Sequence, residues 1–246
     1  MLAELATQAF WLGLLKIIGV NVILSGDNAV VIALAARSLP PTQQKKAVFW
    51  GAGAAVILRI ILTIFAAALL ALPWLKIVGS LLLFWIGVKL LIPEDGDDDI
   101  KASDQLLAAI KTILIADLVM SLDNVIAVAA AAGGHMGLLI IGLAISIPLV
   151  VFGATLLIKL MERFPVIITL GAGLIGWVAG EMLVADRALA GLLTTLGVAY
   201  RDDKPYVAGY SLELIAAAIG FMLVIALGKW LAARQRRTAV PADATK

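Results

Sequence analysis

The sequence has no cysteine and only one histidine, His135, among its 246 residues. The lack of cysteine excludes disulfides, iron–sulfur clusters and thiolate metal sites. The sequence also lacks a glycine-rich phosphate loop, an HExxH motif and a nucleophile constellation, which argues against an ATP-driven pump and an intramembrane protease. We therefore expect no enzyme, no tightly bound cofactor and no nucleic-acid partner.

Charged residues are scarce as well, at 15% of the chain, whereas 63% of the residues are hydrophobic. Soluble domains are about 45–50% apolar. The apolar runs are about 20 residues long and do not alternate, as expected for helices that cross a bilayer core of roughly 30 Å. We predict an all-α polytopic membrane protein with seven transmembrane helices. The predicted spans are 8–36, 47–72, 74–92, 106–131, 136–158, 164–184 and 211–232.

The placement of basic residues predicts how the chain crosses the membrane. Lys and Arg gather in the first, third and fifth loops and after the last span, and few lie in the other loops. Since cytoplasmic loops carry the excess of basic residues, we expect the N-terminus outside and the C-terminus in the cytoplasm. Residues 1–232 are predicted to form a single transmembrane domain and 233–246 a disordered cytoplasmic tail. The external connection is expected to contain a short interfacial helix near 188–197.

One polar string occurs twice inside the apolar runs, as NVILSGDN and DLVMSLDN. Its polar positions are Asn21, Ser25, Asp27 and Asn28 in the first copy and Asp117, Ser121, Asp123 and Asn124 in the second. Each residue of the second copy lies 96 positions after its mate. A weaker match pairs Trp85 with Trp177 and sets Lys89 opposite Glu181. These matches indicate an internal duplication.

The duplication predicts two inverted three-helix repeats, over 8–92 and 106–184, with the helix at 211–232 as an addition. Each repeat has an odd number of spans, so two consecutive repeats cross the bilayer in opposite senses. They would be related by a pseudo-two-fold axis in the membrane plane, with substrate sites near the midplane where the repeats meet. The two polar strings are the candidates for that position.

The polar strings supply carboxylate, amide and hydroxyl oxygens and no imidazole or thiolate. Such donors suit magnesium, calcium or manganese better than copper or zinc. A charged side chain near the centre of a span costs roughly 2.5–3.5 kcal/mol on insertion scales, which favours a functional role for the aspartates. For the Ser and Asn residues the alternative is hydrogen bonding between helices, at about 0.6 kcal/mol per bond. The candidate ligands are Asp27, Asn28, Asp123, Asn124, Asp117, Asn21, Ser25 and Ser121.

The local geometry of the strings allows two interpretations. On an ideal helix Asp27 lies roughly 120° from the face shared by the other three polar residues of its copy. Either the helix unwinds near Gly26 and brings Asp27 to the same cavity, or each aspartate faces a neighbouring span. Leu122 stands at the Gly26 position in the second copy, so unwinding is better supported in the first.

Other charged residues have open roles. Arg59 lies in the middle of the second span, either as a counter-ion that holds a carboxylate until a cation displaces it or as a static ion pair. Glu181 and Glu213 lie toward the external side. The acidic run at 94–99 lacks the spacing of a calcium loop and is expected to be solvated, or to concentrate cations near the entrance.

The segments GDNAVVIALAARSLP (26–40) and SLDNVIAVAAAA (121–132), in a seven-span layout, resemble TerC-family integral membrane proteins, which are related to the lysine-exporter superfamily. The resemblance implies efflux of a divalent metal, chiefly manganese, across the bacterial plasma membrane, and a role in delivering metal to exported enzymes. By matching positions, it also implies that Asp27, Asn28, Asp123 and Asn124 form the central site.

Our leading hypothesis is a secondary transporter that exports manganese(II) or a similar cation as the two three-helix units rock around the site. The first alternative is an exporter of an amino acid or another small organic cation, whose ammonium group the aspartates would bind. The second is a membrane scaffold that delivers metal to exported proteins. The expected partners are a divalent metal ion and the lipid bilayer. The sequence leaves open whether the chain also forms a homo-oligomer or binds exported metalloproteins.

Overall fold

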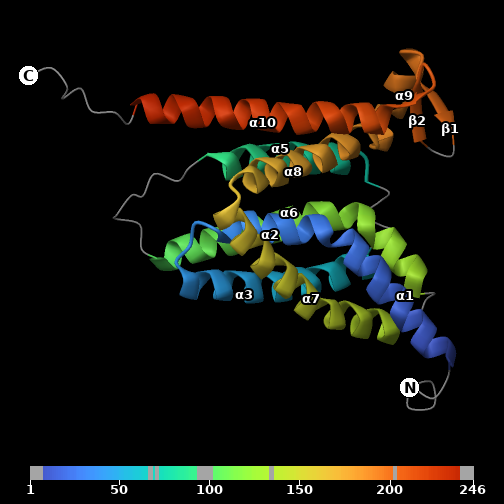
Figure 1. Cartoon of the computed structure of the whole chain (residues 1–246). Helices are drawn as coiled ribbons and strands as arrows, with labels where there is room; N and C mark the ends of the chain where they lie inside the picture. Colours follow the sequence, from blue (N-terminus) through green and yellow to red (C-terminus); the bar gives the residue numbers. More distant parts are fainter. Residues whose placement is uncertain are drawn as a thin grey trace, which may run out of the picture. The chain divides into compact units, whose positions relative to one another are not determined.

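The computed structural model is almost entirely helical (Figure 1). It describes residues 8–65, 69, 72–92, 102–132, 136–201 and 204–238. The helices are α1 (Gln8–Leu24), α2 (Gly26–Ala36), α3 (Pro41–Ile64), α5 (Leu75–Leu91), α6 (Ala102–Ala132), α7 (Met136–Arg163), α8 (Val166–Val184), α9 (Arg187–Thr195) and α10 (Leu212–Thr238). The strands are β1 (Ala199–Arg201), β2 (Lys204–Val207) and β3 (Tyr210–Ser211). The predicted acidic run at 94–99 and His135 lie outside the described residues.

Five of the described helices, α3, α6, α7, α8 and α10, are long and apolar enough to cross a membrane. The predicted all-helical membrane class is therefore confirmed, whereas a count of seven spans is not. The difference has two sources. The first predicted span is interrupted and forms the shorter helices α1 and α2, and the third forms α5, which has 17 residues.

The chain forms two compact units. The first unit contains α1, α2, α3, α6 and α7, and the second contains α5, α8, α9, the strands and α10. Each predicted repeat contributes helices to both units, since α1 to α3 lie in the first and α5 in the second. The compact units thus differ from the three-helix units that the rocking hypothesis assumes.

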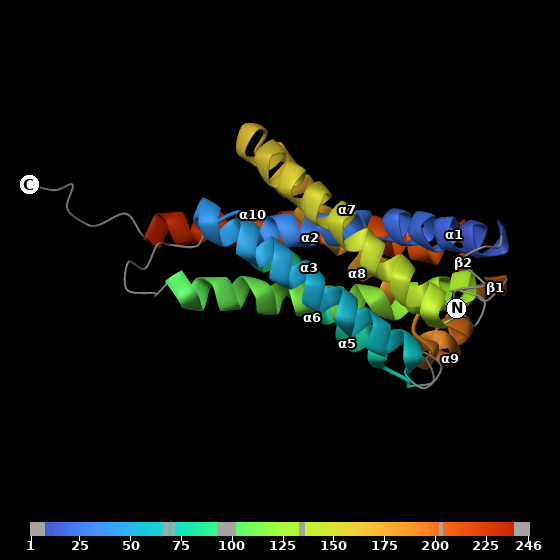
Figure 2. The ribbon, with the colours of Figure 1, turned by 90° about the horizontal axis from the view of Figure 1, so that it is seen from below.

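In the first unit, α3 packs along α6, and α7 packs against α1, α2 and α3. Figure 2 shows α3 and α7 crossing these partners obliquely. Gly142 of α7 lets the side chain of Ile17 approach closely from α1. A buried apolar cluster forms where these helices meet, and it consists of Ile17, Val56, Leu139 and Leu143. This packing fixes the helix interruption between α1 and α2 against α6 and α7.

In the second unit, α8 and α10 pack backbone against backbone. A methyl group on Gly176 would overlap the carbonyl oxygen of Gly220, and one on Gly180 would overlap that of Ala216. Both helices thus present small residues at four-residue spacing, a pattern that allows membrane helices to approach closely. Gly87 of α5 faces Val224 of α10, so α5 lies against the same pair.

A single buried carboxylate joins the starts of two helices in the second unit. Asp186 caps α9 by accepting a hydrogen bond from the Ala188 amide at 2.8 Å. Its other oxygen accepts hydrogen bonds from the amides of Lys76 and Ile77, at 3.0 and 3.2 Å, at the start of α5. Helix N-termini leave such amides without intrahelical partners, so one side chain satisfies both ends.

The connection between α8 and α10 contains the short helix predicted near 188–197, as α9, and also a small sheet that was not predicted. The strands pair antiparallel in the order β1-β2-β3. Between β2 and β3, Ala208 and Gly209 both have positive φ, at 50° and 87°. Tight hairpin turns of the primed types need such values.

The predicted disordered tail at 233–246 is wrong for its first part, because α10 continues to Thr238. The residues past 232 are mostly Ala, Arg and Gln, which are strong helix formers. Arginines in a last turn also interact favourably with the helix dipole. Arg234 lies over the Trp230 ring, 5.8 Å from its centroid, one turn back along the helix. Residues 239–246 lie outside the described part of the chain.

Candidate functional site

The candidate site is built on the interruption of the first predicted span. α1 ends at Leu24, α2 begins at Gly26, and Ser25 between them has φ −106° and ψ 3°. The backbone amide of Asn28, which would bond to the Leu24 carbonyl in a continuous helix, donates instead to Asp27 Oδ1 at 2.8 Å. The helix is thus interrupted next to Gly26 in the first copy of the string, as the first of the two interpretations expects. In the second copy α6 runs through without a break.

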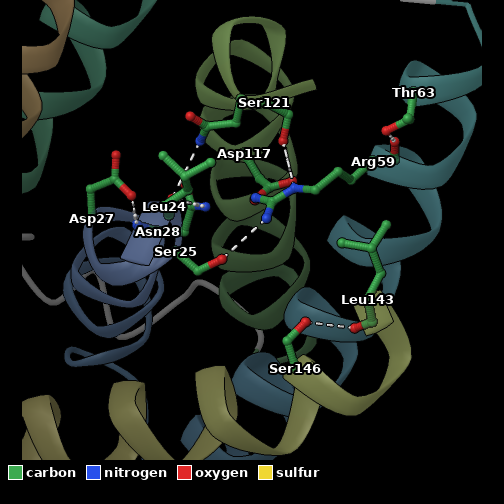
Figure 3. A network of polar contacts seen from close by, with 11 residues as sticks. Leu24, Ser25, Asp27, Asn28, Arg59, Thr63, Asp117, Ser121, Leu143 and Ser146 are labelled. Atoms are coloured by element: carbon green, nitrogen blue, oxygen red, sulfur yellow. Dashed lines mark hydrogen bonds and ion pairs between the residues drawn. The ribbon is translucent and has the colours of Figure 1, made fainter. Parts of the chain in front are cut away.

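Two side-chain amides replace the missing helical bond at the Leu24 carbonyl. Asn28 Nδ2 donates to this oxygen at 3.4 Å, and Asn124 Nδ2 donates to it from α6 at 3.3 Å. Figure 3 shows Asn28 beside Leu24 at the start of α2. The interruption is therefore held open by residues from both copies of the polar string.

Arg59 of α3 forms the centre of a buried polar network (Figure 3). Its Nη2 pairs with Asp117 Oδ1 at 2.5 Å, and its Nε donates to Ser121 Oγ at 2.9 Å, both on α6. Its Nη1 donates to Ser25 Oγ at 3.1 Å, at the helix interruption. Ser121 Oγ also donates to the second oxygen of Asp117 at 3.2 Å. Arg59 and Asp117 are only 3% and 5% exposed, so this ion pair is inside the protein.

The matched positions of the two strings converge on shared partners. Ser25 and Ser121, which are mates in the duplication, both accept hydrogen bonds from Arg59. Asn28 and Asn124, also mates, both donate to the Leu24 carbonyl. Residues nearly a hundred positions apart thus surround the same two groups from opposite sides.

Asn28 carries a buried oxygen that has no hydrogen-bond partner among the described residues. The side chain is 3% exposed, and its Oδ1 is unpartnered. Exchanging the amide nitrogen and oxygen would set an acceptor against the Leu24 carbonyl, so the assigned orientation is the favourable one. Buried acceptors rarely stay unpaired without a reason such as an ion.

Six of the eight predicted ligands are placed by these contacts. Ser25, Asp117 and Ser121 surround Arg59, whereas Asp27, Asn28 and Asn124 lie at the helix interruption. The side chains of Asn21 and Asp123 lie outside the described residues. No group of three or more His, Cys, Asp or Glu side chains that could hold a metal occurs within the described ranges.

Two contributors to the site were not predicted. The Leu24 carbonyl is a backbone group, and only the glycine two positions later signals that it leaves the helical ladder. Thr63 donates its hydroxyl to the Arg59 carbonyl at 2.7 Å, one turn along α3. A threonine four residues after a buried arginine was the available signal, but the same spacing is common in membrane helices.

The other predicted charged residues take no part in these contacts. Trp177 Nε1 donates to Glu181 at 2.8 Å, and at the matched positions Lys89 lies 5.4 Å from the Trp85 ring centroid. Glu213 is 3.8 Å from Lys204 in the connection between α8 and α10. These four charged residues all belong to the second compact unit, and each of these contacts lies within one element or between neighbouring elements.

Residues 6–237 match the protein family described as the integral membrane protein TerC family. The chain is 45% identical over 181 residues to membrane protein YjbE of Bacillus subtilis, which covers 74% of this chain and 83% of that protein. It is 28% identical to YkoY of the same organism, over 76% of this chain and 63% of YkoY. It is 25% identical to the inner membrane protein YoaE of Escherichia coli and spans only 44% of that protein, against 94% of its own length. No solved structure matches this chain.

Proposed function

The chain belongs to the TerC family of integral membrane proteins, and on that premise we propose that it is a secondary transporter that exports a hard divalent cation. Manganese(II) is the first candidate substrate. The observation that carries the proposal is the buried polar junction between α1, α2, α3 and α6, inside helices that are otherwise apolar. Ionisable residues within membrane spans are costly and typically mark ion pathways.

The proposed cation ligands are the Asp27 carboxylate and the unpartnered Asn28 oxygen. The C-terminal end of α1 adds its partial negative charge, because the last carbonyls of a helix point along the helix dipole. Interrupted helices whose carbonyl ends face a cation are a recurring feature of secondary transporters. Carboxylate and amide oxygens favour manganese, magnesium or calcium over softer metals.

Release of the cation requires its charge to be replaced. We propose proton antiport, in which a site carboxylate takes up a proton as the metal leaves. The hinge of the motion would be the interruption at Ser25, because an unbonded helix joint bends at a lower cost than a continuous helix.

The test measures manganese(II) uptake by sealed vesicles that contain only the purified full chain. The wild type is expected to carry manganese(II), and Asp27→Asn to reduce the rate at least tenfold. Asp104→Asn is the matched control, because Asp104 is an exposed acid in the first turn of α6. Transport by Asp27→Asn at the wild-type rate would refute the site.

The same preparation separates the alternatives. Saturable manganese(II) binding without flux in vesicles would favour the scaffold that delivers metal to exported proteins. Flux of an organic cation without saturable metal binding would favour the amino acid exporter.

A further inference from the structure

Arg59 binds oxygens of the polar strings that a cation could also use. Its side chain contacts Ser25, Asp117 and Ser121, and all three are candidate cation ligands. They reach the guanidinium from the helix interruption on one side and from α6 on the other. The Arg59 guanidinium is a cation that belongs to the protein itself, and it already contacts oxygens from both copies of the duplicated string.

We propose that Arg59 is a tethered counter-cation that competes with the transported divalent cation for Asp117. In this cycle the guanidinium holds Asp117 in the metal-free state, gives it up when the metal binds, and expels the metal when it returns. The inference rests on the proposed function and adds a regulatory residue to the same site.

Charge balance supports competition. The negative charge of Asp117 is already compensated by the buried Arg59 guanidinium, and the second oxygen of this carboxylate accepts a hydrogen bond from Ser121. A divalent cation that binds the same carboxylate would set a second cation against this guanidinium. Uncompensated charge is strongly unfavourable at low dielectric. The metal and the guanidinium would therefore oppose each other at Asp117.

A static ion pair that only ties α3 to α6 would use the same contacts, so the two interpretations must be separated by metal affinity. If Arg59 competes with the metal, its removal strengthens metal binding. If Arg59 is only a structural link, its removal leaves the affinity unchanged or weakens it through loss of packing.

The experiment measures manganese(II) binding to the purified full chain by the electron paramagnetic resonance signal of the free ion. Arg59→Gln is expected to bind at least tenfold more tightly than the wild type and to release metal more slowly in vesicles. The double variant Arg59→Gln with Asp117→Asn should bind at least tenfold more weakly than Arg59→Gln, because it lacks the second carboxylate. Equal binding by the wild type and Arg59→Gln, or by the two variants, would overturn the inference.

A chemical rescue gives an independent measurement if Arg59→Gln folds poorly. In Arg59→Ala, guanidinium ion at the concentration that restores the wild-type melting temperature should weaken manganese(II) binding, whereas the wild type should not respond. Rescue of melting without any effect on metal binding would overturn the inference.

The outcomes also distinguish this inference from the proposed function. If neither the wild type nor Asp104→Asn binds or carries manganese(II), the proposed function fails. The alternative result is that the wild type and Asp104→Asn both bind and carry manganese(II), and Asp27→Asn does neither. If Arg59→Gln then binds manganese(II) no more tightly than the wild type, only the role of Arg59 fails.

Discussion

The two compact units hold their helices together by different means. Among the described residues, the first unit buries Ser25, Asn28, Arg59, Thr63, Asp117, Ser121 and Ser146, whereas the second buries only Ser80 and Asp186 among polar side chains. The second unit instead brings α8 and α10 into backbone contact through glycine. Since lipid tails are as apolar as leucine, membrane helices associate mainly by close packing and hydrogen bonds. The described part of the second unit packs its helices without a buried ion pair, which supports the functional role proposed for the network of the first unit.

The largest expected effect comes from breaking the ion pair of the first unit. Asp117→Asn leaves Arg59 buried without its counter-ion and should lower the free energy of unfolding by about 3–5 kcal/mol. Denaturation in detergent, followed by intrinsic fluorescence, measures the change. Adding Arg59→Gln should restore most of the loss, because the pair is then neutral. A small loss of stability in Asp117→Asn alone would mean that water reaches the ion pair. The two units would then differ less in how they hold their helices together.

The next effect concerns the glycine contact of the second unit. Gly180→Ala places a methyl group against the Ala216 carbonyl and should cost about 1–3 kcal/mol. Gly53→Ala is the matched control, since a methyl group at this position of α3 meets nothing within 4 Å. It should stabilise the chain by about 0.5–1 kcal/mol, because alanine is the better helix former. Thermal melting of both variants checks the opposite signs, and equal shifts would contradict close packing of α8 with α10.

A smaller effect is expected at the carboxylate shared by two helices. Asp186→Ala removes the cap of α9 and the bonds to the start of α5, and should cost about 0.5–2 kcal/mol. Hydrogen exchange should become faster at the amides of Lys76, Ile77 and Ala188. Asp104→Ala, at an exposed position, should change stability by less than about 0.5 kcal/mol. Unchanged exchange at Lys76 would show that Asp186 serves α9 alone.

The smallest effect compares one substitution in both units. Ser121 and Ser80 are both fully buried, but Ser121 bonds to Arg59 on another helix, whereas Ser80 donates to Ile77 within its own helix at 2.8 Å. Ser121→Ala should cost about 0.6–1.7 kcal/mol, and Ser80→Ala close to zero. Paired melting curves in the same detergent test this difference. Losses of equal size would indicate that burial, and not the link between helices, sets the cost.

The sequence was most informative where polar residues interrupt apolar runs. Several residues of the repeated string do lie at one junction, and the helix is interrupted next to Gly26, as one of the two interpretations of the string expects. Both signals stand out in the sequence against leucine and alanine. The choice of Asp117 as the partner of Arg59 could not be predicted. The choice depends on how α3 and α6 are rotated about their axes. A single polar side chain per helical turn does not determine that rotation.

The grouping of helices was less predictable. Duplication indicates descent and direction, but packing follows local shape, so α5 and α8 join α10 through glycines that also occur elsewhere in the chain. The strands β1 to β3 have two to four residues each, too few for alternation to be recognised. The continuation of α10 past 232 shows that helix propensity outweighs polarity in this segment.

The contact of Gly176 with Gly220 also limits how the protein can move. No side chain separates the two backbones, so the backbone of each helix packs directly against the glycine of the other. If one helix slid along the other, larger side chains would meet at this contact and force the helices apart. Tilting the pair as one piece needs no such separation. We therefore expect α8 and α10 to move together as one rigid pair in any conformational change.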